Sequence, residues 1–498
     1  MTRLRTPAVA TLAVIATLAG LIASGRSSDA AQRRSESTIR RVWPVALTGL
    51  RELSPLFCET AGCGVGSSAT SASYRGTSLP FVRVGANGDL YLADVYGSQP
   101  IRVIGLDGRI KRVIRTRVPV GRLAIASDGT IAYSDRNTPT AIHEISPTGR
   151  ERIIAGDHAH GNDKGDRYCK CGDGGPARSA KFVDVNDILF DPRQRLVIAD
   201  TGHHRIRRIS RSGRVGTIVG VGVPCSISSP PDKPCSPAGT PAKIADVHDP
   251  IQLAYAPDGT LWFTNLRYAQ PEQIIHVSSA GLLEFVAEAR SLNAVFGQLA
   301  VTPDGRPLTF VIRDGKLPRL ASIDPATGAL TSVFGQAYGL KCDDEAVALT
   351  CGDGRSGHSV ELDSTTGTFT TDRFGGIYLA TIGGEVRYLP PVGGKAIRLG
   401  LALTADYPEE IHHGHGLTVR YRVSSPDARI TLRIARKGAK HPIISDLPGA
   451  TTGHDAGTLR WNGMIDGKPA HVGSYLIEVV ARSRGRIATR QLVVGVRP

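Results

Sequence analysis

Residues typical of long helical bundles are scarce in this chain. Its 498 residues include only 2 Met and 12 Lys, and aromatic residues make up 5%. Glycine and proline are abundant instead, at 57 and 31 residues. The scarcity excludes a Lys-, Glu- and Leu-rich bundle or coiled coil. Hydrophobic residues make up 41%, which excludes a disordered chain. The composition therefore predicts an all-β fold with many turns.

Long blocks of like charge are also absent. The 60 basic and 45 acidic residues leave a net charge of +15, but the basic residues are scattered as pairs such as Arg33-Arg34, Arg40-Arg41 and Arg207-Arg208. No zinc finger, homeodomain or RNP-like aromatic motif accompanies them. Nucleic acid is therefore not an expected partner. The basic residues are expected to lie on solvated faces, where they would give a weak attraction to anionic cell-surface polymers.

The chain lacks the common catalytic signatures. It contains no GxSxG nucleophile elbow, no P-loop and no HExxH motif, and the stretch from Gly64 to Ser67 does not have the order that an elbow requires. No catalytic residue is assigned on this basis.

The first thirty residues resemble an export signal. Arg3 and Arg5 precede an uncharged apolar stretch from Ala8 to Ile22, and small residues follow up to Ala30. Residues 1–30 are therefore predicted to be a signal peptide, and the protein to be secreted or extracytoplasmic. An uncleaved membrane anchor is the alternative, since Thr2 to Ser24 could lengthen the span. No membrane span is expected beyond this segment.

The cysteines agree with export because their number is even and they form local clusters. Disulfides are expected within four clusters: Cys58 with Cys63, Cys169 with Cys171, Cys225 with Cys235, and Cys342 with Cys351. The Cys169-Lys170-Cys171 ring is tight, so exchange with a neighbouring cluster stays open. A zinc site made of this pair with His158 and His160 is the alternative interpretation.

One sequence motif recurs along the chain. A polar turn, usually with glycine, precedes a short apolar run that often ends in Ala-Asp. It occurs at 87–94, 128–135, 193–200, 258–265, 304–311 and 374–381. Six repeats predict six small sheets that stack radially into a closed β-propeller.

The unit around residue 200 shows four predicted strands. They span 187–191, 196–199, 205–209 and 215–219, each ending at a turn. The stretch from Ile39 to Thr48 resembles the outermost of these strands. It is predicted to complete the sixth sheet beside Val386 to Leu389, which removes the free edges of an open ring.

A family resemblance rests on the same unit. Residues 172–177 read GDGGPA, residues 199–207 read ADTGHHRIR, and a glycine-flanked strand follows at 213–220. This resembles the NHL repeat of bacterial exported proteins and implies a six-bladed propeller over residues 39–395. His203, His204 and Arg205 occupy the family's Asn-His-Arg position. With Asp200 they are expected to bind turns of their own blade.

The sequence pattern changes after residue 395, where the predicted propeller ends. Residues 396–498 predict a β-sandwich of about seven strands, at 396–406, 417–423, 429–436, 441–447, 457–461, 473–483 and 486–494. The Trp461-Asn-Gly463 turn and the Gly473-Ser-Tyr475 start of a long strand resemble the Ig-like domain of flagellar hook-capping (FlgD) type. The resemblance implies a spacer or adhesion module.

Candidate ligand-binding residues lie where inner strands open on the channel of a propeller. They are Asn186, Asp187, His248 and Asp249, with Asn293 and Asp372 at the start of two further inner strands. Such a ring could hold Ca²⁺ or Zn²⁺. No second histidine occupies an equivalent inner position, so the first expectation is that these side chains bind backbone groups and that no cofactor is present.

The sandwich carries a histidine-rich stretch, Glu409 to His415. Adjacent residues of a strand point to opposite faces, so only His413 and His415 are expected to be able to share a metal. An exposed loop is the preferred interpretation.

The resulting functional hypothesis is an exported, non-catalytic binding scaffold for a protein, a glycan or a cell-wall polymer. The alternative is a metal-dependent propeller lyase or lactonase with a site at the channel mouth. A surface anchor or adhesin is a third interpretation. The sequence leaves the ligand and the oligomeric state open.

Overall fold

The computed structural model describes a large part of the chain. The described residues are 43–46, 65, 68–69, 80–94, 101–138, 140–156, 171–222, 236–267, 270–288, 294–313, 319–335, 368–380, 386–391, 396–403, 410–437, 444–448 and 456–498. The predicted signal peptide and every candidate cysteine except Cys171 lie outside these ranges. Within them, strands dominate, and the named helices are short 3-10 turns such as η3 (Ala177–Ser179), η4 (Thr201–His203) and η5 (Ala242–Ile244). The all-β prediction is confirmed.

Nothing helical in the described ranges is both long and apolar enough to cross a bilayer.

The described strands of the first 391 residues form six four-stranded antiparallel sheets, which we number as blades in chain order. Blade 1 contains β2 (Pro80–Val84), β3 (Leu90–Asp94), β4 (Ile101–Ile104) and β5 (Ile110–Ile114). Blade 2 contains β6 (Val120–Ile125), β7 (Ile131–Asp135), β8 (Ile142–Ile145) and β9 (Glu151–Ala155). Blade 3 contains β10 (Val185–Phe190), β11 (Leu196–Asp200), β12 (Arg205–Ile209) and β13 (Val215–Val219). Blade 4 contains β14 (Asp249–Tyr255), β15 (Leu261–Arg267), β16 (Gln270–Val277) and β17 (Leu283–Glu288). Blade 5 contains β18 (Ala294–Val301), β19 (Pro307–Arg313), β20 (Arg319–Ile323) and β21 (Leu330–Phe334). Blade 6 contains β22 (Thr368–Thr371), β23 (Ile377–Ala380), β24 (Val386–Leu389) and β1 (Trp43–Ala46).

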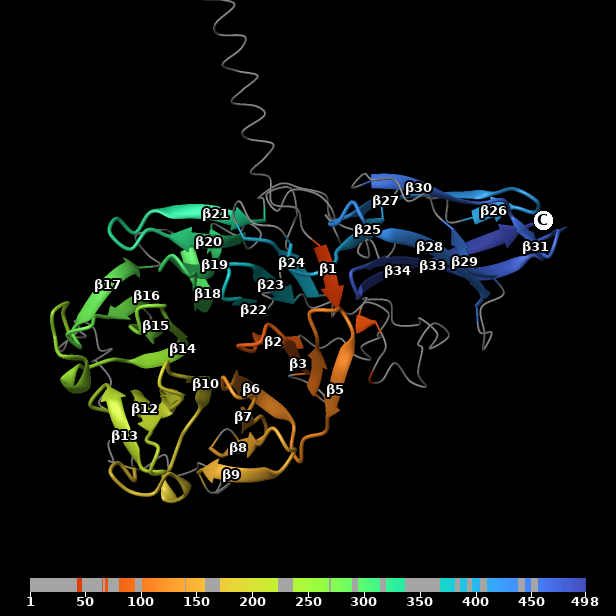
Figure 1. The fold of residues 1–498 in the computed structure, drawn as a ribbon. Helices are drawn as coiled ribbons and strands as arrows, with labels where there is room; N and C mark the ends of the chain where they lie inside the picture. Colours follow the sequence, from red (N-terminus) through yellow and green to blue (C-terminus); the bar gives the residue numbers. More distant parts are fainter. Residues whose placement is uncertain are drawn as a thin grey trace, which may run out of the picture.

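The blades form a ring around a central axis (Figure 1). Each innermost strand contacts the innermost strand of the next blade, and β22 contacts β2, so the ring is a β-propeller. Apolar side chains fill the seams between blades. Val197 and Ile206 of blade 3 share one buried cluster with Leu253 and Phe263 of blade 4. A single sheet could not bury both faces, and here each face is covered by the neighbouring blade.

Strand β1 closes the ring. It is antiparallel to β24, with Trp43 opposite Tyr388, so the first described strand and the last strand of the ring share one sheet. This is the closure that the sequence predicts. The pairing covers a sheet edge that would otherwise expose unpaired backbone groups.

Blade 3 follows its predicted strands closely. β12 and β13 have the predicted bounds, while β10 begins two residues earlier, at Val185, and β11 extends to Asp200. The extension arises because Val185 pairs with Asp200 across an irregularity in the register.

The C-terminal region is a β-sandwich of two sheets. A three-stranded sheet contains β25 (Leu401–Leu403), β27 (Leu417–Val423) and β30 (Ala456–Trp461). A five-stranded sheet contains β26 (Glu410–His412), β34 (Arg486–Arg497), β33 (Gly473–Ser483), β28 (Arg429–Arg436) and β29 (Ile444–Pro448). Both sheets contribute to one apolar core that includes Val419, Leu459, Ile434 and Ile477. The short hairpin β31 (Met464–Ile465) and β32 (Lys468–Pro469) follows Trp461, whose ring centre lies 5.7 Å from that of Tyr475.

Strand β26 was not predicted from the sequence. It contains only three residues and pairs in parallel with the end of β34, at a sheet edge. A segment this short has no readable alternation.

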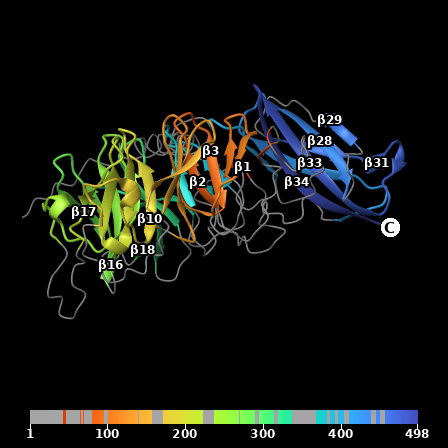
Figure 2. The ribbon, with the colours of Figure 1, turned by 90° about the horizontal axis from the view of Figure 1, so that it is seen from below.

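The sandwich lies beside the ring (Figure 2). Arg398, which is 2% exposed, connects the two parts. Its guanidinium donates to the Tyr378 hydroxyl at 2.9 Å and to the backbone oxygens of Gly105 at 2.5 Å and Gly88 at 2.8 Å. The Ile487 backbone N–H donates to the oxygen of Asp107 at 2.8 Å. Blades 1 and 6 thereby hold the sandwich in place.

Candidate functional site

Asp187 lies at the centre of the ring, in the innermost strand β10, and only 1% of it is exposed. Its Oδ1 accepts a hydrogen bond from the guanidinium of Arg83 on β2, two blades away, at 3.1 Å. The backbone N–H of Leu253 on β14 donates to its Oδ2 at 3.0 Å. Burial raises the pKa of Asp187 and lowers that of Arg83, and each charge opposes the shift of the other. The carboxylate therefore binds groups of the chain itself.

The side chain of Asn186, its predicted partner, forms a local hydrogen bond. Its side-chain Nδ2 donates to the backbone oxygen of Asp184 at 3.2 Å. Its own backbone oxygen accepts a hydrogen bond from Nε of Arg122 on β6. Asn186 and Asp187 thus link the innermost strands of blades 1 to 4.

His248 and Asp249 form a second polar group, at the start of β14. The structure brings His204 of blade 3 to them, and we call these three residues the histidine cluster. One ligand atom from each lies within 4.8 Å of the others. Nδ1 of His204 is 3.0 Å from Oδ1 of Asp249, and Nδ1 of His248 is 3.2 Å from Oδ2. The carboxylate therefore lies between two imidazoles from adjacent blades.

The local backbone explains how His204 reaches this position. It follows the 3-10 turn η4 and has a left-handed conformation with φ of 52°. The hydroxyl of Thr201 in that turn donates to the backbone oxygen of Pro250 in β14 at 2.6 Å. Nδ1 of His204 is also hydrogen-bonded to the backbone oxygen of His248. The turn therefore directs this side chain toward the next blade.

The electrostatics of the cluster favour a charged Asp249. Burial by itself would raise the pKa of this carboxyl, but the contacts with His204 and His248 outweigh it and lower the pKa to about 2. A carboxylate and two imidazoles are a donor set that can hold a divalent metal ion.

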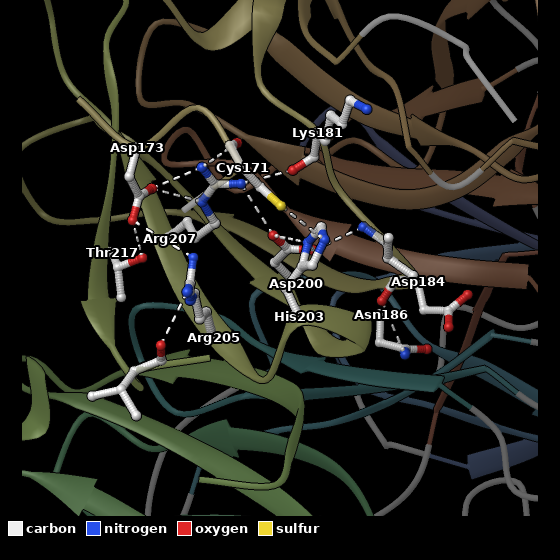
Figure 3. A network of polar contacts seen from close by, with 12 residues as sticks. Cys171, Asp173, Lys181, Asp184, Asn186, Asp200, His203, Arg205, Arg207 and Thr217 are labelled. Carbon is white, nitrogen blue, oxygen red and sulfur yellow. Dashed lines mark hydrogen bonds and ion pairs between the residues drawn. The ribbon is translucent and has the colours of Figure 1, made fainter. Parts of the chain in front are cut away.

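The remaining residues of the family motif form a separate network within blade 3 (Figure 3). Arg207 is fully buried and binds Asp173 at 2.7 Å and Asp200 at 3.2 Å. Nδ1 of His203 lies 3.0 Å from Asp200, and its Nε2 lies 3.2 Å from Sγ of Cys171. His203 and Asp200 therefore bind turns of their own blade, as expected.

His204 is where that expectation is wrong. It was predicted to bind its own blade with His203, but adjacent residues at a turn diverge, and His204 contacts blade 4 instead. It also supplies a second histidine, which the sequence did not indicate at an inner position because His204 comes from the connection between β11 and β12.

Asp372, a further candidate, does not join the site. Asp372 was expected to begin an inner strand, but β22 ends at Thr371 and Asp372 lies in the following turn. There its carboxylate accepts hydrogen bonds from the backbone N–H groups of Phe374 and Gly376 at 2.9 and 2.8 Å. Asn293 lies outside the described residues.

The histidines of the sandwich are exposed, as the preferred interpretation expects, but the pair that lies close together differs from the predicted one. β26 ends at His412, and the chain then turns at Gly414, where φ is 78°. The rings of His412 and His415 come within 6.0 Å of each other. A turn, rather than a continuous strand, therefore pairs His415 with His412 instead of with His413.

Of the predicted cysteine clusters, only Cys171 falls within the described residues, and it is disulfide-bonded. A sulfur in a disulfide is not the thiolate that a zinc site needs. The other seven cysteines, His158 and His160 lie outside the described ranges, and so do the predicted pairings.

A groove of about 420 Å³ lies between blades 2 and 3. Its apolar lining includes Ile154, Leu196 and Ile209. Its charged lining consists of Arg152, Arg178, Arg195, Arg211 and Glu144. Arg152 is 2.7 Å from Glu144, and Arg195 is 2.7 Å from Asp191, while Arg178 and Arg211 are exposed. The sequence did not indicate this groove because its residues come from separate strands and turns.

Comparisons with known proteins match parts of the chain. No family model matches it. The chain is 26% identical to Teneurin-3 of Danio rerio over 305 residues, which is 53% of this chain and 11% of that protein. It is 32% identical to Teneurin-1 of Gallus gallus over 127 residues, 24% of this chain and 5% of that protein. The chain thus spans about a tenth or less of these relatives.

Solved structures with a similar shape are more distant in sequence. A protein of unknown function from Bacteroides thetaiotaomicron is 13% identical, with a TM-score of 0.44 over 70% of this chain and 76% of that chain. A gluconolactonase from Xanthomonas campestris is 12% identical, with a TM-score of 0.40 over 71% and 98%. Virginiamycin B lyase from Staphylococcus aureus is 15% identical, with a TM-score of 0.37 over 63% and 96%. Similarity at this level says nothing about activity.

Proposed function

We propose that this chain is an exported, non-catalytic binding scaffold that recognises an acidic glycan or cell-wall polymer. In this proposal the ring is an NHL-type propeller, and the sandwich is an Ig-like spacer of the flagellar hook-capping type. The observation that carries the proposal is the arginine-lined groove between blades 2 and 3.

The chemistry of the groove suits an anionic ligand with an apolar face. Four arginines and one glutamate line it. Arg152 and Arg195 pair with carboxylates of the chain, and the exposed Arg178 and Arg211 can donate to carboxylate or phosphate groups of a ligand. Ile154, Leu196 and Ile209 offer apolar contacts for a sugar ring or a similar group.

The hydrogen bonds of Asp187 support a binding role over a catalytic one. Asp187 is a buried carboxylate at the ring centre, yet Arg83 and backbone N–H groups already bind it. A general base needs a free position within hydrogen-bond reach of a substrate.

Export is part of the proposal. The charged start, the apolar stretch from Ala8 to Ile22 and the even number of cysteines support a secreted or membrane-anchored protein with disulfides. A partner at the cell surface is consistent with the net charge of +15.

A matched pair of charge variants tests the groove. The double variant Arg178→Glu/Arg211→Glu changes two exposed groove residues. Arg429→Glu/Arg460→Glu makes the same charge change at two exposed positions of the sandwich, one on each sheet. Binding of the full chain to an array of acidic glycans and wall polymers is measured at two salt concentrations. The groove variant is expected to bind about 10-fold more weakly or worse, since two charged hydrogen bonds are lost.

The sandwich variant is expected to bind like the wild type. Equal losses in both variants would mean that the attraction depends on net charge alone, and the groove would not be the binding site. No saturable binding by the wild-type chain would reject the scaffold proposal for these ligands.

A metal-dependent lyase or lactonase is the second candidate, and the histidine cluster is the observation that favours it. A metal held there could polarise a carbonyl group or activate water. Turnover of lactone or lyase substrates by the wild type, abolished by His248→Gln, would favour this candidate over the scaffold.

A further inference from the structure

The histidine cluster joins two blades through three ionisable side chains. His204 belongs to the turn before β12 in blade 3, whereas His248 and Asp249 lie at the start of β14 in blade 4. His204 and His248 are buried, and Asp249 is partly exposed. The cluster therefore has one side open to solvent, at the carboxylate.

Two ring nitrogens of the cluster have no hydrogen bond. Nε2 of His204 and Nδ1 of His248 are both buried, and neither has a hydrogen-bond partner. Nδ1 of His248 lies within ion-pair distance of Asp249, at 3.2 Å, but not in hydrogen-bond geometry. Buried polar atoms without partners are unfavourable in a stable protein, so they point to a missing ligand.

The spacing of the donors fits a metal ion. The contact of 3.2 Å between Nδ1 of His248 and Oδ2 of Asp249 is close to the separation of neighbouring ligands around a tetrahedral ion with bonds of about 2.1 Å. Nδ1 of His204 is hydrogen-bonded to the backbone oxygen of His248, so the unpartnered Nε2 is the candidate ligand atom of His204. One ligand atom from each of the three residues lies within 4.8 Å of the others. Small side-chain rotations would bring all three ligands to one ion.

The surrounding backbone holds this arrangement before any ion binds. The hydrogen bond of 2.6 Å from Thr201 to the Pro250 oxygen fixes the turn that carries His204 against β14. The Asn265 side-chain oxygen accepts from the backbone N–H of His248 at 3.1 Å, which fixes the other side. Preorganised ligands lower the cost of binding.

We propose that His204, His248 and Asp249 bind a divalent transition-metal ion of the Zn²⁺ class, which links blades 3 and 4. Two imidazoles and one carboxylate are donors that Zn²⁺ prefers. Ca²⁺ takes six to eight oxygen ligands, a set that this cluster does not provide. Three protein ligands would leave one position of a tetrahedral ion for water.

The test measures metal binding and not activity. The full chain is freed of metal with a chelator, and Zn²⁺ is added in equilibrium dialysis. Co²⁺ is used in parallel because its visible spectrum reports tetrahedral nitrogen and oxygen ligands. The wild type is expected to bind one ion at this site and to melt at a higher temperature when the ion is present.

The variants separate this site from the exposed histidines. His248→Gln and Asp249→Asn each remove one ligand and are expected to weaken binding about 100-fold or more. His412→Ala/His415→Ala removes the exposed histidine pair of the sandwich and is expected to keep the site intact. Near-ultraviolet circular dichroism of the metal-free proteins shows whether each variant keeps its fold.

Two outcomes would overturn the proposal. One is a wild-type chain that shows neither a tetrahedral Co²⁺ spectrum nor a rise in melting temperature with Zn²⁺. The other is tight binding that disappears in His412→Ala/His415→Ala. Both comparisons remain decisive if His248→Gln or Asp249→Asn does not fold. Neither outcome bears on the arginine-lined groove, so the scaffold proposal is tested separately.

Discussion

Arg83 and Asp187 form an ion pair at the centre of the ring, with 3.1 Å between the guanidinium nitrogen and the carboxylate oxygen. The two residues are 104 positions apart in the chain and belong to blades 1 and 3. Because the pair spans blade 2, it connects innermost strands that do not share a sheet. The Asp187 side chain is 1% exposed and that of Arg83 is 16% exposed, so the buried carboxylate depends on its cation.

Removing one member of this pair should be more harmful than removing both. Arg83→Met leaves the Asp187 carboxylate buried without its cation and is expected to cost about 3–5 kcal/mol in the free energy of unfolding. The double variant Arg83→Met/Asp187→Leu should recover a large part of that loss. Urea unfolding of the single and double variants measures both values. Losses that simply add would show that the two charges do not depend on each other.

Arg398 should couple the sandwich to the ring. Arg398→Met removes donors to the Gly105 and Gly88 oxygens and to Tyr378, so buried acceptors lose their partners. The expected loss is about 3 kcal/mol in the free energy of unfolding. Arg429→Met, at an exposed position of β28, is the control and should change stability by less than about 0.5 kcal/mol. Similar stability of the two variants would contradict a coupling role.

Deletion of residues 39–48 should destabilise the whole ring. It removes β1, the outermost strand of blade 6, so β24 becomes a free sheet edge. The melting temperature of the propeller should fall, and the blades should unfold together because each covers its neighbour. Calorimetry of the shortened and full chains measures this. An unchanged melting temperature would dismiss the closure role of β1.

Replacing glycine with alanine should affect stability differently at two positions. A Cβ at Gly400 would lie 2.5 Å from Cγ of the buried Trp43, whereas a Cβ at Gly216 meets no atom within 4 Å. Gly400→Ala is expected to destabilise the protein by about 1–3 kcal/mol through overpacking. Gly216→Ala should be neutral or slightly stabilising. Thermal melting compares them, and an equal response would show that Gly400 does not need its small size.

The pH dependence of blade 3 should reflect Asp173. Burial would raise the pKa of this carboxyl, but Thr217, Arg207 and Arg205 lower it below the ordinary value of 3.8. A lowered pKa in the folded state contributes stability that is present above about pH 4 and is lost as the pH falls through the folded value. Asp173→Asn should therefore be less stable than the wild type at neutral pH, and the difference should shrink in acid. A difference that stays constant down to pH 2 would rule out this linkage.

The periodic parts of the fold can be read from the sequence alone. Glycine turns followed by short apolar runs predict the strands of blade 3, and β12, β13, β27, β28 and β33 have their predicted bounds. The resemblance of residues 39–48 to an outer strand predicts the closing pair. These features depend on local alternation and turn residues, which neighbouring positions in the chain determine. The three-residue strand β26 has no such pattern.

The candidate site depends on the tertiary structure. His248 and Asp249 could be named from their place at an inner strand, but His204 reaches them only because a left-handed turn and the packing of two blades direct it there. The same holds for Arg83 with Asp187 and for Arg398 with blade 1. The sequence by itself determined an all-β chain of repeated small sheets followed by a sandwich. Which distant side chains meet was decided by the closing of the ring, since contacts between blades have no period along the chain.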